Sequence, residues 1–461
     1  MVEAMGERRP GSSAALAYRA LLGLGFAAML ALSFPGHLTY DSVTQLVEGR
    51  ADAQQSWGPA IYAWVLGLSD RIAGGTAAYL LASAALLLLV VWSLPGLRPR
   101  TSWAAVAAAA LVAASPAVVL YQGIVWKDVL FANFAVAGFV ALAHANEARG
   151  GAGRWIALAL AALALALACL VRQNGLIVVA VAALTVGLRM RERGWGRAAL
   201  SAAGSSLAVF LLAQAIDAAI QPPNADPGRR TDTGLRILLH YDILGAVARD
   251  PSIPLPHIDA ANPAADDLIR TKARLAYSPE RVDQLEQHPD VRRSFWRTPA
   301  PAIRAQWLEV ATQHPGAYLA HRLDVFRWVF LTPELERCLP VAVGVEGVPA
   351  HLQSLSLAAG QDANDRRVAA YALNFAGTPL YSHAAFAVLA AVLAVLLLAR
   401  GAPADLAIAG MLGAGLATAA SYFAISIACD YRYLYILDLT ALTGLLYFAL
   451  DPSLKRIRRS S

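Results

Sequence analysis

The sequence predicts an all-α fold: a polytopic transmembrane helical bundle of about 10 spans with a mostly helical extracytoplasmic domain. Of the 461 residues, 57% are hydrophobic and only 15% are charged. Several uncharged apolar runs reach about 18 residues, the length that a helix needs to cross the hydrocarbon layer of a bilayer. Basic residues also alternate between successive loops, as expected for a chain that crosses a membrane repeatedly.

Hydropathy and helix length predict ten spans. They cover residues 17–34, 75–95, 103–121, 129–143, 155–171, 174–188, 198–219, 380–399, 406–428 and 433–450. The fourth and sixth are short for a span. No small-residue cleavage site follows the first, so we expect it to be retained as a helix and not removed as a signal peptide.

The basic residues predict the orientation of the chain. If the N-terminus is cytoplasmic, the following also fall on the cytoplasmic side: Arg8, Arg9, Arg19, Arg98, Arg100, Arg149, Arg154, Arg189, Arg191, Arg193, Arg197, Arg400, Lys455, Arg456, Arg458 and Arg459. Both termini are then cytoplasmic, and the protein is a multi-pass protein of the inner (plasma) membrane. Outside the large loop, the opposite face carries Arg50, Arg71, Lys127, Arg172 and Arg432.

Three parts of the chain follow from these spans. They are an N-terminal membrane domain (1–220) with a first outer loop (35–74), an extracytoplasmic domain (221–378) and C-terminal membrane helices (379–461). The charges of the large outer segment nearly balance, so the net charge of +6 and the pI of about 9.3 come from the cytoplasmic loops. Nothing in this pattern indicates nucleic-acid binding.

The outer domain shows helical signals. Ser278-Pro279-Glu280 fits a capped helix start, a second helix is predicted through Ile303 and Val310, and the apolar stripe from Tyr318 to Phe330 predicts a third. That stripe favours packing against the membrane domain or the bilayer surface over a substrate groove.

The three cysteines carry little information. Cys169 and Cys429 lie in or at the ends of spans, where a cysteine is usually an apolar filler. Cys338 lies in the outer segment, and a pair with Cys429 is the alternative in an oxidising compartment. No zinc-site spacing and no phosphate-binding glycine loop occurs in the sequence.

Asp41 is the most informative residue, because it lies in the polar loop that directly follows the first span. Ser42 and Gln45 have the spacing of a capping box, so a short helix is predicted to begin here. An acid at a helix start is favoured by the helix dipole, which is the structural alternative for Asp41. The functional alternative is that Asp41 acts as a general base outside the bilayer.

Four short polar clusters are predicted on the same side of the membrane. They are Tyr40-Asp41, Trp126-Lys127-Asp128, Arg172-Gln173-Asn174 and Asp430-Tyr431-Arg432-Tyr433. Charges at this depth are costly unless they are paired or used. Structural ion pairs are the alternative to a site, for example Asp128 with Arg172 or Asp430 with Arg432.

Such a set fits the transfer of a group from a lipid phosphate. Asp41 would take the proton of the acceptor hydroxyl, while Lys127, Arg172 and Arg432 would bind phosphate. Asp128 would position Lys127, or contact the acceptor or a metal. The remaining substrate-binding candidates are Tyr40, Asn174, Asp430 and Tyr433.

These residues resemble the GT-C superfamily of integral membrane glycosyltransferases, which includes protein O-mannosyltransferases and the aminoarabinose transferase of lipid A. The resemblance rests on Thr39-Tyr40-Asp41-Ser42, Trp126-Lys127-Asp128 and Arg172-Gln173-Asn174-Gly175, with Arg432-Tyr433 similar to a pair near the end of several relatives. It covers nearly all of the membrane part and is weak over 221–378.

The resemblance implies a polyprenyl-phosphate sugar donor, membrane lipids as partners, an inverting displacement at the outer face, and Asp41 as the general base. The acceptor would be a glycan, a lipid or a protein. Many members carry His-Pro in the first loop, whereas this chain has Trp57-Gly58-Pro59. Some relatives need a divalent cation and others do not, so the cofactor is left unknown.

Three other classes of protein remain open. An O-antigen polymerase or ligase would carry its catalytic residues on the large loop. A transporter would use intramembrane acids such as Asp217 and Asp438, with sequence symmetry between its halves, and the chain shows no clear symmetry. A non-catalytic scaffold would tolerate a neutral residue at position 41.

Overall fold

The computed structural model describes residues 12–54, 56, 58–148, 150–222, 224 and 226–454. Trp57 and the basic residues Arg8, Arg9, Arg149, Lys455, Arg456, Arg458 and Arg459 lie outside the described residues. The chain forms two compact units. Unit 1 comprises 1–224, 341–418 and 435–461, and unit 2 comprises 225–340 and 419–434.

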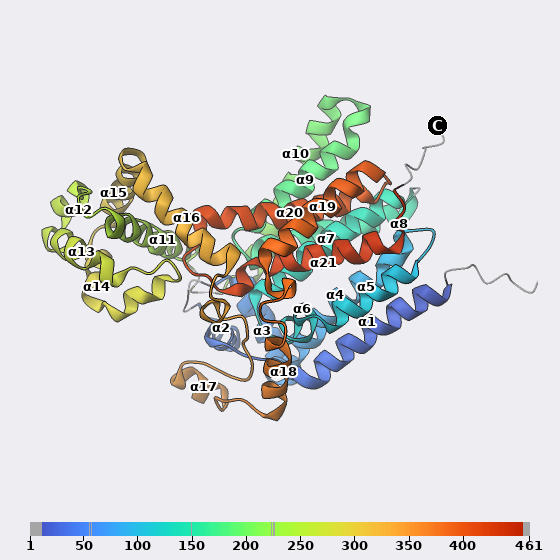
Figure 1. The fold of residues 1–461 in the computed structure, drawn as a ribbon, viewed down its shortest axis with the longest axis horizontal. Helices are drawn as coiled ribbons and strands as arrows, with labels where there is room; N and C mark the ends of the chain where they lie inside the picture. Colours follow the sequence, from blue (N-terminus) through green and yellow to red (C-terminus); the bar gives the residue numbers. More distant parts are fainter. Residues whose placement is uncertain are drawn as a thin grey trace, which may run out of the picture. The chain divides into compact units, whose positions relative to one another are not determined.

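Unit 1 is built mainly from long helices (Figure 1), and short 3-10 helices lie between some of them. Its α-helices are α1 (Ser12–Ser33), α2 (Tyr40–Ala51), α3 (Ala60–Ala73), α4 (Ala77–Ser93), α5 (Trp103–Ala114), α6 (Pro116–Val119), α7 (Lys127–Glu147), α8 (Gly151–Val171), α9 (Gly175–Met190), α10 (Trp195–Ile220), α17 (Pro349–Leu355), α18 (Ala363–Leu373), α19 (His383–Arg400), most of α20 (Asp405–Ile425) and α21 (Tyr435–Leu450). Between the described residues of the chain, extended backbone forms isolated bridges only.

Every predicted span corresponds to a helix of the structure. In the described part of the chain, eight helices are long and apolar enough to cross a membrane, or up to nine if a bent pair counts as one span. The bent pair is Trp103–Ala114 with Pro116–Gly123, which meet at 51° where Pro116 interrupts the helix. The sixth predicted span is α9, whose 16 residues are short for a bilayer crossing.

Two helices form the centre of the bundle. In α7 and α21, 83% of the apolar window is buried, and the two helices pack against each other. In α10 only 11% of that window is buried, and apolar side chains such as Leu200 and Leu207 are exposed. A helix with this apolar outer surface is stable in lipid and not in water.

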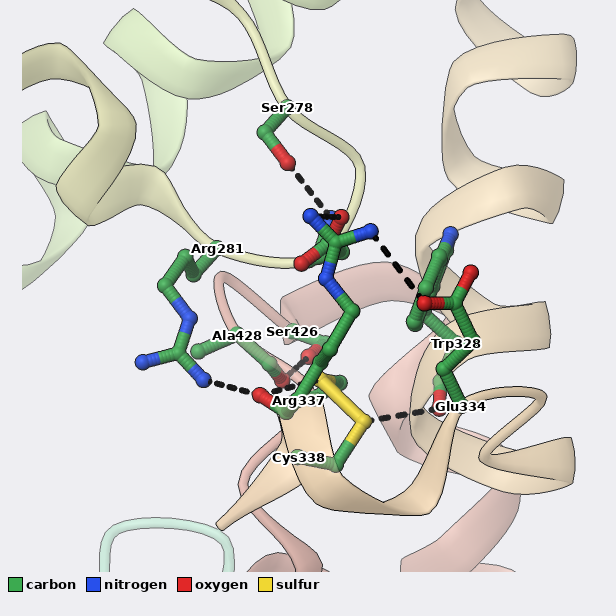
Figure 2. Close-up of a disulfide and its surroundings, with 10 residues drawn as sticks. Ser278, Arg281, Trp328, Glu334, Arg337, Cys338, Ser426 and Ala428 are labelled. Carbon is green, nitrogen blue, oxygen red and sulfur yellow. Dashed lines mark hydrogen bonds and ion pairs between the residues drawn. A yellow bond between two sulfur atoms is a disulfide. The ribbon is translucent and has the colours of Figure 1, made fainter.

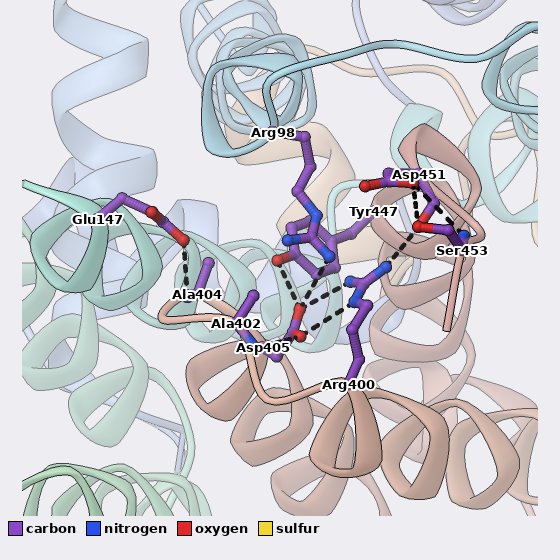
Figure 3. A network of polar contacts seen from close by, with 9 residues as sticks. All are labelled: Arg98, Glu147, Arg400, Ala402, Ala404, Asp405, Tyr447, Asp451 and Ser453. Carbon is purple, nitrogen blue, oxygen red and sulfur yellow. Dashed lines mark hydrogen bonds and ion pairs between the residues drawn. The ribbon is translucent and has the colours of Figure 1, made fainter. Parts of the chain in front are cut away.

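A buried charge cluster ties the ends of several helices of unit 1 together (Figure 3). The Asp405 carboxylate, 1% exposed, accepts hydrogen bonds from Arg400 at 2.7 and 3.0 Å, from Arg98 at 3.3 Å and from the Tyr447 hydroxyl at 2.8 Å. The same carboxylate also accepts a hydrogen bond from the Ala402 backbone N–H at 2.7 Å. Burial of these charges is tolerated because each is paired.

Unit 2 is a helical domain with its own core. Its helices are α11 (Pro227–Arg249), α12 (Pro256–Ala261), α13 (Pro263–Ala276), α14 (Pro289–Arg297), α15 (Ala300–Gln313), α16 (Pro315–Leu331) and the end of α20. Residues such as Ile243, Ile269, Phe295 and Ile303 are fully buried together. The helices predicted through Ile303 and from Tyr318 are α15 and α16.

The helix predicted to start at Ser278 is absent. Backbone groups on either side of that position pair with another segment instead: the Val282 N–H donates to Ile427 O and the Cys429 N–H donates to Glu280 O, both at 2.8 Å. These long-range bonds hold residues 280–282 against residues 427–429, and a 3-10 helix begins only at Val282. Tertiary pairing thus overrides the local capping signal.

The segment 426–434 is anchored to unit 2 by a disulfide between Cys338 and Cys429 (Figure 2). Their Cα atoms lie 5.1 Å apart, within the ordinary range for a disulfide. The guanidinium of the buried Arg322 adds a hydrogen bond to Ser426 O at 2.8 Å. Of the two interpretations of Cys429, the structure therefore has the disulfide with Cys338 and not an isolated apolar cysteine.

The division into units differs from the predicted parts of the chain. Residues 341–378 belong to unit 1, because their backbone pairs with the first loop through Leu38 and Val345. Residues 419–434 belong to unit 2, because of the disulfide and the pairing of Ile427 and Cys429 with residues 280–282.

We expect Cys338→Ser to lower the free energy of unfolding by about 2–4 kcal/mol, because the bond closes a loop in the unfolded chain. The two cysteines are separated by 91 positions. Thermal unfolding of the full-length protein with and without reductant measures this, and Cys169→Ser is the control, because Cys169 is a free cysteine. Rapid maleimide labelling of Cys338 in the unreduced wild type would contradict the assignment.

Candidate active site

Asp41 lies in the first turn of α2, close to the positive end of the helix. The N-cap is Thr39, so Ser42 occupies the third helical position, and its hydroxyl accepts from the Thr39 N–H at 3.2 Å. The capping box predicted for Ser42 and Gln45 is therefore wrong by three residues, because the helix begins at Tyr40. The Asp41 carboxylate is 45% exposed, whereas Ser42 and Val43 are buried.

The loop before α2 is held on one side by residues 123–126. The His37 N–H donates to Gly123 O and the Val125 N–H donates to His37 O, both at 2.9 Å. Ser42 donates to Val125 O at 2.6 Å. At Gly36, whose φ is +119°, a Cβ would lie 2.6 Å from a Val125 methyl, so only glycine fits.

The far end of α2 packs closely on α3. A Cβ at Gly49 would lie 2.0 Å from Ala63 O, and a Cβ at Gly67 would lie 2.2 Å from Gly49 O. These two glycines let the backbones approach more closely than side chains would allow. Asp41 is thus presented by a helix that is fixed at both ends.

Lys127 is brought to Asp41 by the same contacts. It begins α7 directly after Trp126, whose indole N–H donates to the Thr39 hydroxyl at 3.0 Å. The Lys127 ammonium lies 3.4 Å from the Asp41 carboxylate, and its side chain is 21% exposed. Two predicted site residues that are 86 positions apart therefore form one accessible ion pair.

Asp128 and Arg172 form a second ion pair beside the first. Asp128 follows Lys127 in α7 and its side chain is 3% exposed, while Arg172 follows the last residue of α8 and is 16% exposed. Asn174 lies two residues further on and is half-buried. The structural pairing that was the alternative for Asp128 is therefore present.

Tyr40, the remaining candidate in unit 1, is 57% exposed next to Asp41. The other predicted cluster belongs to unit 2, where Arg432 pairs with Asp430 at 3.2 Å and lies 5.8 Å from the ring of Tyr433. The phosphate contact predicted for Arg432 stays a prediction.

A segment that the sequence did not single out also borders this site. Residues 343–357, here called the strap, include α17 and pair with the first loop. The Leu38 N–H donates to Gly344 O, and the Glu346 N–H donates to Leu38 O, both at 2.8 Å. His351 of the strap lies 3.3 Å from the Thr44 hydroxyl of α2. No local sequence pattern indicates the strap, because its place beside α2 depends on contacts with residues about 300 positions earlier in the chain.

Glu48 is a second acid on α2 that sequence reasoning missed. It is 4% exposed and accepts hydrogen bonds from the Gln45 amide at 3.4 Å and from the Ser56 backbone N–H. Its position seven residues after Asp41 places it on the same helical face, two turns along. The carboxylate thereby shapes the end of the loop that joins α2 to α3.

His37 is buried between the loop and α18. Its Nδ1 lies 3.2 Å from the Gly344 N–H and 3.1 Å from the Asp365 carboxylate. Burial lowers the pKa of His37 below the usual value, although the charges of Asp365 and Asp362 act in the opposite direction. The neutral ring, which can accept from Gly344, is the favoured form.

We therefore expect acid to destabilise the fold through His37. The unfolded ring binds a proton near pH 6.5, whereas the folded ring binds it only at lower pH. Stability from the neutral ring is complete above about pH 6.5 and is lost as the pH falls through the folded pKa. Melting temperatures at pH 7.5 and 5.5 should differ more for the wild type than for His37→Gln; equal differences would contradict this.

The residues do not form an evident metal site. Among the described residues, no group of three or more His, Cys, Asp or Glu side chains could hold a metal ion. Asp41 is paired with an ammonium and Asp128 with a guanidinium. The arrangement pairs an exposed carboxylate at a helix start with the Lys127 ammonium, which suits proton transfer next to a developing negative charge.

The fold and these residues define a polytopic, all-helical membrane protein with a polar site in unit 1. No protein-family model matches the chain, and no curated protein matches it. Solved structures are similar to it at low sequence identity.

The oligosaccharyltransferase AglB from Archaeoglobus fulgidus, in complex with an inhibitory peptide and a dolichol-phosphate, is 12% identical with a TM-score of 0.42; the match covers 94% of this chain and 50% of AglB. ArnT from Cupriavidus metallidurans, bound to undecaprenyl phosphate, is 14% identical with a TM-score of 0.36; the match covers 93% of this chain and 77% of ArnT. The arabinosyltransferase EmbB from Mycobacterium smegmatis is 18% identical with a TM-score of 0.32; the match covers 94% of this chain and 43% of EmbB. This chain thus spans about half the length of AglB.

Proposed function

We propose that this protein is an integral membrane glycosyltransferase that transfers a sugar from a polyprenyl-phosphate donor to a hydroxyl of an acceptor, with Asp41 as the general base. The observation that carries the proposal is the pairing of an exposed carboxylate with Lys127 at 3.4 Å, next to the ion pair of Asp128 and Arg172. A base and a phosphate-binding cation are thereby adjacent.

The chemical step assigns a role to each side chain. The acceptor oxygen forms a bond to the anomeric carbon, the bond from that carbon to the phosphate oxygen breaks, and the electron pair leaves with the phosphate. Asp41 takes the hydroxyl proton, which raises the nucleophilicity of the oxygen. Lys127 has three N–H donors, so it can contact Asp41 and the departing phosphate together.

Arg172 would add a second cationic contact. Its guanidinium presents a planar fork of donors that matches phosphate oxygens, and one part of this fork is used by Asp128. Asp128 then acts as a positioning residue, because it fixes the guanidinium beside the start of α7. In unit 1 the other proposed contacts to substrate are Tyr40, which is exposed next to Asp41, and Asn174, which is half-buried two residues after Arg172.

We also propose that the site and unit 2 lie outside the cytoplasm. The disulfide between Cys338 and Cys429 supports this side for unit 2, because such bonds persist in oxidising compartments and are rare in the cytosol. The basic residues of the opposite loops support the same orientation.

The test is a donor series with the purified protein in proteoliposomes. Polyprenyl-phosphate sugars, labelled in the sugar, should yield labelled acceptor and free polyprenyl phosphate. Turnover with polyprenyl-pyrophosphate glycans alone would favour the polymerase or ligase alternative. Movement of label into the liposome lumen without chemical change would favour a transporter.

The transporter alternative has one structural observation in its favour. Asp438 on α21 and His383 on α19 form a fully buried pair at 2.9 Å within the spans. Intramembrane ionisable pairs often have a function. Asp217, the other acid considered, accepts a hydrogen bond at 2.6 Å from Gln221, the C-cap residue of the same helix, which is a local contact.

A further inference from the structure

The strap contacts both the loop before α2 and the first turns of α2, the helix that carries Asp41. Its Gly344 and Glu346 pair with Leu38, its Gly347 lies against Val43, and its His351 contacts Thr44. A Cβ at Gly347 would lie 2.8 Å from a Val43 methyl, so the backbone itself covers α2 here. The strap therefore runs alongside the first turns of α2.

His351 is the strap side chain that approaches this part of α2. Thr44 follows Asp41 by three positions, and residues at this spacing are neighbours on a helix surface, with Cβ atoms about 5–6 Å apart. The imidazole therefore contacts a residue that lies about one helical turn from Asp41 on α2. It is half-buried, so part of the ring remains accessible.

The contact with Thr44 involves one of the two ring nitrogens of His351, and the tautomer sets what the other nitrogen can do. The Thr44 hydroxyl lies 3.3 Å from Nδ1 of His351. If the hydroxyl donates to Nδ1, the neutral ring carries its proton on Nε2. Nε2–H is then a second donor, on the ring nitrogen that Thr44 does not contact.

We propose that the strap forms the acceptor-binding side of the site and that His351 donates a hydrogen bond through Nε2 to an oxygen of the acceptor. The ligand class is a molecule with neighbouring hydroxyl groups: one donates its proton to Asp41 and attacks the sugar, and another accepts from His351. This inference rests on the proposed function, in which Lys127 and Arg172 bind the phosphate of the sugar donor.

The test separates the use of acceptor from the use of donor. The assay uses labelled polyprenyl-phosphate sugar, with graded amounts of a cell-envelope extract as the acceptor probe and water as the competing acceptor. For His351→Ala we expect the amount of extract needed for half-maximal transfer to rise about three- to tenfold, the effect of losing one hydrogen bond. The half-maximal donor concentration and the release of label into water should not change.

Matched variants guard against a structural explanation. Thr44→Val should shift the extract dependence in the same direction, and Thr44→Ser, which keeps the hydroxyl, should restore it. His257→Ala, at a half-exposed histidine paired with Glu309 in unit 2, should leave every value unchanged.

Two results would overturn the inference. One is a His351→Ala variant that needs the same amount of extract for half-maximal transfer as the wild type. The other is a His351→Ala variant in which the half-maximal donor concentration and the release of label into water change as much as the half-maximal amount of extract. If instead the wild type neither transfers nor releases sugar, the proposed function itself fails and the inference falls with it. That case is recognised because Asp41→Asn would then equal the wild type.

Discussion

Asp41→Asn should lower the rate of sugar transfer by about 10²- to 10⁴-fold, the usual contribution of a general base. An amide keeps the shape of the side chain but cannot accept the hydroxyl proton. The exposed carboxylate is 3.4 Å from Lys127, so its replacement also removes one partner of that ammonium. Because the pair is accessible to solvent, we expect stability to change by no more than about 1 kcal/mol.

The measurement is initial-rate transfer of labelled sugar in proteoliposomes with equal amounts of folded protein. Asp70→Asn is the matched control, because Asp70 lies in the same predicted outer loop and pairs with Arg50 at 2.6 Å. The hydrogen bond from Arg50 holds the pKa of Asp70 below its usual value, so this acid is engaged in a structural pair. Asp70→Asn should retain transfer near the wild-type rate.

A wild-type rate in Asp41→Asn would remove Asp41 as the base and would favour the scaffold alternative. A loss of transfer in both variants would point to a general disturbance of the loop. Lys127→Met offers a third comparison, since it keeps the packing of the chain while removing the charge. We expect it to slow transfer and to weaken donor binding together.

The largest effect on stability should come from Asp405→Ala. Its carboxylate is the shared acceptor of Arg98, Arg400 and Tyr447 (Figure 3). Arg400 is 1% exposed and Arg98 is 7% exposed, so the substitution leaves two guanidinium groups in a buried place without their anion. Breaking a buried pair in this way costs about 3–5 kcal/mol.

We expect Asp405→Ala to accumulate poorly and to melt at a clearly lower temperature than the wild type in detergent. Asp70→Ala is the control, because it breaks an ion pair whose Arg50 side chain is 42% exposed, and such pairs contribute about 1 kcal/mol or less. Equal melting temperatures for the two variants would show that the buried cluster is unimportant. Replacing the three charged residues together with apolar residues should recover part of the loss.

Much of this protein's secondary structure is determined by the sequence itself. A span needs a long apolar run, and that property is local, so every predicted span coincides with a helix of the structure. Errors arose where local signals were weak or were overridden. Pro116 bends the third span, and residues 280–282 pair with 427–429 where a helix start was predicted.

Parts of the candidate site were also predictable. Charged residues are costly at the edge of a bilayer, so several of them on one predicted side of the membrane indicate a site. This signal can be seen in the sequence without knowledge of the fold. The sequence marked Asp41, Lys127, Asp128 and Arg172, and the structure brings them together as two adjacent ion pairs. It could not tell which residues pair, because nothing local distinguishes a partner from a neighbour.

Only the tertiary structure decided what surrounds Asp41. His37 and Gly344 are 307 positions apart, as are Thr44 and His351, yet each pair is in contact. The disulfide likewise joins cysteines separated by 91 positions. The sequence determined the helices because apolar length and capping act over a few residues. The strap, His37 and the partners of Asp41 were decided by packing, because contacts between distant segments form only once the whole chain is folded.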